Sequence, residues 1–122
     1  MKFHPLRSLP LNKSILDLEP WWLEQVHGTD VVLHEGAGAP ARADAAVAFQ
    51  SGRVCAVMTA DCLPVVFADG RGTRVATAHA GWRGLAAGVL EATIAALGAP
   101  AAELHAWIGP AISQAAFEVG AE

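Results

Sequence analysis

Three side chains suited to metal binding or nucleophilic chemistry stand beside breaks in the apolar pattern: His27, Cys62 and His79. Cys62 and His79 each occur where an apolar run gives way to Gly, Pro or charged residues, and His27 precedes the turn at Gly28. Folds often display reactive groups where strands end, because a rigid scaffold there aims side chains at solvent. Two imidazoles and a thiolate suit zinc and leave a fourth position open for water or substrate. The residue types therefore predict a zinc site if the three side chains converge.

Other chemistry is open to the same residues. Copper also accepts imidazole and thiolate ligands. Without any metal, Cys62 could act as a thiolate nucleophile with His79 as its base, so both are candidate catalytic residues. In an ordinary structural role, Cys62 would be a small buried apolar residue and His79 a packed side chain near a helix start. Asp61 and Pro64 beside the cysteine indicate a strand break and favour a chemical role.

Arg83 is the candidate substrate-binding residue, within the motif His79-Ala-Gly-Trp-Arg-Gly84. Its glycines allow the backbone to approach a ligand closely, and a helix is expected to begin near Arg83. A helix N-terminus and a guanidinium together favour an anion such as phosphate. The alternative is a surface arginine packed over Trp82. Weaker candidates for contacts to substrate or to the metal ligands are Asp44, Asp61 and Gln25.

The composition indicates one globular domain without a large charged surface. Of the 122 residues, 53% are apolar and 16% charged, which is too apolar for a disordered chain. The net charge is -4 and the eight Lys and Arg are scattered, so neither nucleic acid nor a membrane surface is an expected partner. No apolar run could span a bilayer. We expect a cytoplasmic protein with free thiols at Cys55 and Cys62, and some apolar surface that awaits a partner.

The elements expected to position these residues make a mixed α/β domain. Apolar runs without alternation are typical of buried strands, and one long apolar segment with Gly98 and Pro100 after it is typical of a helix. Residues 21–27 and 31–34 predict a β-hairpin with His27 at its bend. Residues 44–49 are ambiguous, and residues 14–18 favour a helical turn. The expected buried strands are 53–59, 63–68, 73–78 and 104–108, and the expected helix is 84–97.

Several motifs in fixed order make the chain resemble the laccase-domain family, which is named for multicopper polyphenol oxidases. The resemblance extends over about residues 21–120. Its motifs are Trp22-Leu-Glu-Gln-Val-His-Gly28, Ala43-Asp-Ala45, Thr59-Ala-Asp-Cys-Leu-Pro64, His79-Ala-Gly-Trp-Arg-Gly84 and Ile108-Gly-Pro-Ala-Ile112.

The resemblance implies a specific site and activity. Family members bind one metal through the residues that match His27, Cys62 and His79. They are described as zinc-dependent enzymes that phosphorolyse adenosine, inosine, guanosine and methylthioadenosine and deaminate adenosine, and copper-dependent phenol oxidation has also been ascribed to them. The implied partners are therefore a purine nucleoside and phosphate. The implied fold is a mixed α/β sandwich, two β-layers covered by helices, with the metal in a surface pocket.

Typical family members are longer than this chain and carry further segments on both sides. We therefore expect residues 1–122 to form a single, incomplete laccase-like domain, in which metal binding is retained even where turnover is not. Ala116-Phe117 also stands where family members often have Cys-Tyr. An inactive metal-binding fragment is thus an alternative to an enzyme, and the sequence leaves the oligomeric state open.

Overall fold

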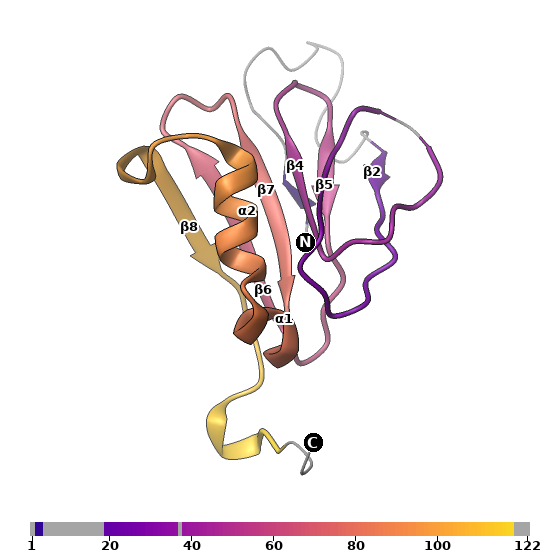
Figure 1. The fold of residues 1–122 in the computed structure, drawn as a ribbon, viewed down its shortest axis with the longest axis vertical. Coiled ribbons are helices and arrows are strands. Elements are labelled where there is room, and N and C mark those ends of the chain that lie inside the picture. The colour runs from indigo at the N-terminus through magenta and orange to yellow at the C-terminus, as the bar shows by residue number, and fades with distance from the viewer. Residues whose placement is uncertain (1, 4–18, 37, 119–122) are drawn as a thin grey trace.

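The computed structural model describes residues 2–3, 19–36 and 38–118, and the helical turn expected at residues 14–18 lies outside them. Within these ranges the strands form two sheets, of order β1-β5-β2 and β3-β4-β7-β6-β8 (Figure 1). The strands are β1 (Lys2–Phe3), β2 (Pro20–Trp21), β3 (Val31–Leu33), β4 (Ala45–Ala48), β5 (Val54–Ala56), β6 (Leu63–Asp69), β7 (Val75–Ala80) and β8 (Leu104–Ile108). The helices are α1 (Trp82–Ala87) and α2 (Val89–Leu97), with short 3-10 turns at Ala101–Glu103 and Gln114–Ala116.

The larger sheet is the middle layer of the molecule. Successive side chains of a strand point to opposite faces, so Ala45 and Val47 pack under α2, beside Val89 and Leu97. Their neighbours on β4, Ala46 and Ala48, pack on the other face with Cys55 of the small sheet. The mixed α/β fold with two β-layers and covering helices is therefore confirmed.

The expected helix 84–97 is two helices that meet at Gly88. This glycine has a φ of 103°, so it ends α1 in the left-handed region, and α2 begins at the next residue. The first helix starts at Trp82, two residues earlier than expected. Gly98 ends α2 with a φ of 66°, as its place in the sequence predicts. No helix among the described residues is long and apolar enough to cross a membrane.

The predicted hairpin between residues 21–27 and 31–34 is wrong. β2 pairs in parallel with β5 in the small sheet, whereas β3 pairs in parallel with β4 in the large one. The backbone between them finds its partners elsewhere: the amide of Glu24 donates to the carbonyl of Ala41 at 2.8 Å, and that of Ala43 to the carbonyl of Glu24 at 3.1 Å. His27 nonetheless lies at an exposed bend, as expected.

Several strands begin or end at other residues than the sequence predicts. The ambiguous segment 44–49 forms β4, an interior strand of the large sheet. β5 ends at Ala56, and Met58 bonds to a side chain instead of a strand. β7 continues to Ala80, so His79 lies within the strand and not in the loop after it. The strand predicted at residues 63–68 is β6, which extends one residue further to Asp69, and the strand predicted at 104–108 is β8.

Candidate metal centre

His27 is held in an unusual backbone conformation at the bend after Gln25. Its φ of 61° is the only positive value at a non-glycine residue among those described, and such a conformation costs about 1–2 kcal/mol. The carboxylate of Asp44 offsets this cost. Its oxygens accept hydrogen bonds from the amides of Val26, His27 and Gly28 at 2.9, 2.9 and 3.0 Å. The imidazole of His27 is thereby presented at the surface.

His79 approaches the same point from inside the sheet. It lies in β7 with only 4% of its surface exposed, and its Nδ1 is 2.7 Å from Oδ2 of Asp44. The His79 amide also donates to the backbone carbonyl of Asp44 at 2.7 Å. Burial raises the pKa of Asp44, but the hydrogen bonds from His79 and the three amides outweigh it and hold the pKa below its usual value. Asp44 is thus an ionised acceptor that joins both histidines.

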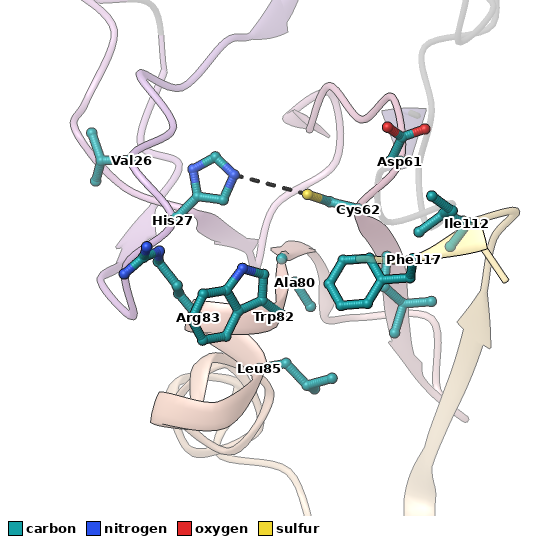
Figure 2. Close-up of a pocket in the computed structure, with 13 residues that line it drawn as sticks. Val26, His27, Asp61, Cys62, Ala80, Trp82, Arg83, Leu85, Ile112 and Phe117 are labelled. Carbon is teal, nitrogen blue, oxygen red and sulfur yellow. Dashed lines mark hydrogen bonds between the residues drawn. The ribbon is translucent and has the colours of Figure 1, made fainter. Parts of the chain in front are cut away.

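Cys62 comes immediately before β6 and is half-buried. Its Sγ is 3.8 Å from Nε2 of His27 (Figure 2). Burial and the negative charges of Asp61 and Asp44 raise the pKa of the Cys62 thiol. A cysteine nucleophile that works without a metal needs the opposite shift, so the electrostatics disfavour a metal-free Cys62–His79 pair and suit a site that a cation completes.

The three donors converge. One ligand atom from each of His27, Cys62 and His79 lies within 4.8 Å of the others, and no other His, Cys, Asp or Glu group of this kind occurs in the described part of the chain. The two imidazoles are edge to face, with ring centroids 4.9 Å apart. In a tetrahedral zinc site, bond lengths of about 2.0–2.3 Å place donors roughly 3.3–3.6 Å apart. The donor set and the short Sγ–Nε2 distance therefore fit zinc after a small closure.

Close backbone approach explains two glycines of the His79–Gly84 motif. A Cβ at Gly81 would lie 2.7 Å from Cδ2 of His27 and 3.2 Å from Sγ of Cys62. A Cβ at Gly84 would lie 3.0 Å from the carbonyl oxygen of Gly28. Any side chain at either position would push the His27 bend away from β7 and α1.

Gln25 secures the other side of the bend. Its side-chain amide donates to the carbonyl of Met58 at 2.7 Å, and its Oε1 accepts from the Met58 amide at 2.8 Å. This pair of bonds imitates a strand pairing. It joins the segment that carries His27 to the segment that leads into Cys62.

A cavity of about 520 Å³ opens beside the three donors. Its volume is within the range of about 300–1,000 Å³ that is usual for small-molecule sites. Apolar side chains form most of the wall, with Trp82, Leu85 and Phe117 shown around it in Figure 2. Its lining includes two of the donors, His27 and Cys62.

Arg83 lines this cavity and also packs on an aromatic ring. Its guanidinium carbon lies 4.6 Å from the centroid of Trp82. Arg83 thus lines the candidate site and stacks on its neighbour, and its role in binding substrate stays a prediction. Since α1 has only six residues, the guanidinium and not the helix dipole is the stronger group for an anion here.

A family model described as multi-copper polyphenol oxidoreductase laccase matches residues 7–122. The chain belongs to this family. Relatives in the family carry a more specific name. Purine nucleoside phosphorylase PA4543 of Pseudomonas aeruginosa is 58% identical over 107 residues, which are 88% of this chain and 44% of the relative. Purine nucleoside phosphorylase YfiH of Escherichia coli K12 is 56% identical over 108 residues, with the same two shares.

Solved structures agree with this family assignment. The Neisseria meningitidis protein NMB0706 is 56% identical and superposes with a TM-score of 0.82, over 86% of this chain and 44% of that one. YlmD from Geobacillus stearothermophilus is 30% identical with a TM-score of 0.70, over 80% and 42%. The chain thus spans less than half the length of these laccase-family relatives.

Asp44 and Gln25 were only weak candidates from the sequence of this family member. The acid could have been noticed because it is a charged residue that directly precedes the apolar run of β4. Asp61, the third weak candidate, is exposed and lines the cavity. His105 lies on the exposed strand β8 and is not among the residues that line this cavity.

Proposed function

We propose that this chain carries the metal centre of a zinc-dependent purine nucleoside phosphorylase, acting on adenosine, inosine, guanosine or methylthioadenosine, with adenosine deamination as a second activity. The observation that carries the proposal is the convergence of His27, Cys62 and His79 beside a cavity of nucleoside-compatible size. The names of the relatives support the phosphorylase class. Residues 1–122 would then be one laccase-like domain of that enzyme.

Each residue has a chemical role in this proposal. His27, Cys62 and His79 hold the ion, which when bound supplies Lewis-acid chemistry and an activated water. The apolar wall of the cavity packs the purine and excludes water. Arg83 binds phosphate through its planar guanidinium, whose two parallel hydrogen bonds to phosphate oxygens fix the orientation of the phosphate.

The phosphorolysis step transfers the ribosyl group. A phosphate oxygen forms a bond to C1′ of the ribose while the glycosidic bond breaks, and the base leaves with that electron pair and takes up a proton. Arg83 holds the phosphate during this transfer and so reduces the entropy lost in bringing two reactants together. Adenosine deamination is a different step: a water oxygen forms a bond to C6 of the purine, the bond from C6 to the exocyclic nitrogen breaks, and that nitrogen takes up a proton from the water and leaves as ammonia.

Copper with phenol oxidation is the second candidate, because the family description names a multi-copper polyphenol oxidoreductase and because two imidazoles and a thiolate also suit copper. Metal analysis of the purified chain separates the two candidates. Zinc near one per chain supports the first, and copper with phenol oxidation supports the second.

Base release tests the phosphorylase assignment. Inosine and phosphate are supplied, and hypoxanthine is followed by chromatography with and without phosphate. We expect release that depends on phosphate and is lost in Cys62→Ala and His79→Ala, whereas His105→Ala on β8 is the matched control and retains it. Unchanged release in the first two variants would show that the site is misassigned.

Bound zinc without any base release would instead indicate a metal-binding module whose turnover needs the rest of the family's length. A cytoplasmic location, and the absence of nucleic-acid and membrane partners, stay predictions from the sequence.

A further inference from the structure

Asp44 is a fully buried carboxylate whose two oxygens are both used twice. Oδ1 accepts from the amides of Val26 and Gly28 at 2.9 and 3.0 Å. Oδ2 accepts from the amide of His27 at 2.9 Å and faces Nδ1 of His79 at 2.7 Å. Four N–H groups from two distant segments therefore converge on one side chain.

This arrangement selects one tautomer of the His79 imidazole. An ionised carboxylate only accepts hydrogen bonds, so Nδ1 of His79 carries a proton that it donates to Asp44. The lone pair available for a metal is then on Nε2. The backbone carbonyl of Asp44 also accepts from the His79 amide at 2.7 Å, which holds β7 beside the carboxylate.

The same carboxylate acts on His27 through the backbone. By binding three successive amides it holds the left-handed φ of 61° at His27. With the backbone so fixed, Nε2 of His27 faces Sγ of Cys62 at 3.8 Å. Asp44 touches neither the sulfur nor the cavity, so its hydrogen bonds act on the site through the two histidines, and only its charge reaches the Cys62 thiol.

We propose that Asp44 is the positioning residue of the centre: it sets the ring form of His79 and the bend of His27, so that the donors are arranged before an ion binds. This inference rests on the proposed metal centre and adds to it a residue that none of the ligand chemistry requires. Carboxylates that orient metal-binding histidines in this way commonly change metal affinity by about 10–100-fold.

Asp44→Asn is a sharp test because asparagine has nearly the same shape as aspartate, so only the hydrogen-bonding groups and the charge change. An asparagine has one acceptor oxygen and one donor amide. In either orientation its NH₂ group faces two N–H donors, those of Val26 and Gly28 or those of His27 and His79. No flip of the side chain can restore all four bonds. Asp30→Asn is the matched control, since Asp30 is exposed and meets Asp44 only through its backbone carbonyl.

The first measurement uses the metal-free protein. Long-range ¹H–¹⁵N spectra report which ring nitrogen carries the proton, and His79→Ala identifies the signal. We expect wild-type His79 to be protonated on Nδ1 and unprotonated on Nε2, and Asp44→Asn to lose this preference. A wild-type His79 with its proton on Nε2 overturns the inference, whether or not the variant folds.

The second measurement is zinc affinity by competition with a chromophoric chelator. We expect Asp44→Asn to bind zinc 10–100-fold more weakly while Asp30→Asn matches the wild type. Equal affinity in a folded Asp44→Asn, checked by circular dichroism, refutes the positioning role and leaves the proposed enzyme standing. Failure of the wild type to bind zinc refutes the zinc centre itself, while the ring-form measurement still decides whether Asp44 orients His79.

Discussion

Gly81 lies where the three donor side chains leave least room. Its φ of -70° is one that alanine adopts without strain, so a substitution there acts only through the added methyl group. That group would lie 2.7 Å from the ring of His27 and 3.2 Å from the sulfur of Cys62. Neither neighbour can withdraw without moving a ligand.

We therefore expect Gly81→Ala to lose bound zinc and to destabilise the fold by about 1–3 kcal/mol, the usual cost of overpacking. Zinc content by elemental analysis and urea unfolding measure the two effects. Gly38→Ala is the control, because a Cβ at Gly38 meets nothing within 4 Å. Full zinc occupancy in Gly81→Ala would show that the donors do not meet at this place.

At the level of single residues, ligand chemistry proposed His27, Cys62 and His79 as a candidate metal set, and the structure brings their donor atoms together. Histidine and cysteine are uncommon residues, so their occurrence beside breaks in the apolar pattern can be noticed in a sequence. The role of Asp44 was not predictable to the same degree, because it depends on amides from a bend whose conformation arises only in the fold. A carboxylate that binds four N–H groups looks in sequence like any acid before a strand.

The hairpin of β6 and β7 sets the alignment of the site at the scale of elements. Pro64 pairs with His79 and Leu63 with Ala80, which brings Cys62 beside Gly81. A register shift by one residue would turn His79 to the opposite face of the sheet. The turn at the far end of the hairpin thus matters for the metal ligands.

Asp69 organises that turn and gives it a pH dependence. Its carboxylate accepts from the amides of Thr73 and Arg74 at 2.8 and 3.0 Å and from the Thr73 hydroxyl. Burial raises the pKa of Asp69. These hydrogen bonds and the charge of Arg74 lower it by more, so the pKa lies below its ordinary value. Because the folded pKa is depressed, the stabilisation is present above the unfolded pKa of about 3.9 and is lost as the pH falls through the folded pKa.

We expect Asp69→Asn to lower the free energy of unfolding by about 1–2 kcal/mol at pH 7 and by less at pH 3, where the unfolded chain is already mostly protonated at this residue. Urea titrations of the wild type and the variant at both pH values give the difference. Asp30→Asn, exposed and outside the turn, controls for the loss of one surface charge. A difference that stays constant from pH 7 to pH 3 would contradict the charge-dependent role.

The strands at residues 63–68, 73–78 and 104–108 were predictable to within two residues, because their apolar runs are continuous. The order of the strands in the two sheets was not predicted. The true pairing of residues 21–34 was not predictable, because their alternation suited a hairpin while the competing acceptors at Ala41 and Asp44 lie well along the chain. The break at Gly88 was missed for a similar reason: its apolar neighbours continue the helical period through it.

On the scale of the whole molecule, β8 leaves an apolar edge to the large sheet. It is the terminal strand of the order β3-β4-β7-β6-β8 (Figure 1), with Trp107 and Ile108 54% and 60% exposed. Free strand edges with apolar side chains promote association between chains. The expectation of uncovered apolar surface, drawn from the composition, agrees with this edge.

We expect Ile108→Lys to reduce concentration-dependent association of the isolated chain and to change its stability by no more than about 0.5 kcal/mol. Sedimentation velocity over a series of concentrations measures the first and thermal unfolding the second. Ile94→Lys adds the same charge on α2, where 37% of Ile94 is exposed. If the two variants reduce association equally, net charge and not the β8 edge is responsible.

The central position of β7 has a consequence for the order in which the site is assembled during synthesis. β4 and β6 are both made before β7, yet neither can pair with the other, because β7 lies between them and bonds to each. His79 is carried by the last-made of these three strands, so the three candidate ligands can come together only after β7 has been synthesised and has paired with β4 and β6. A nascent chain that ends before His79 therefore contains two of the three candidate ligands, His27 and Cys62, but not the complete set.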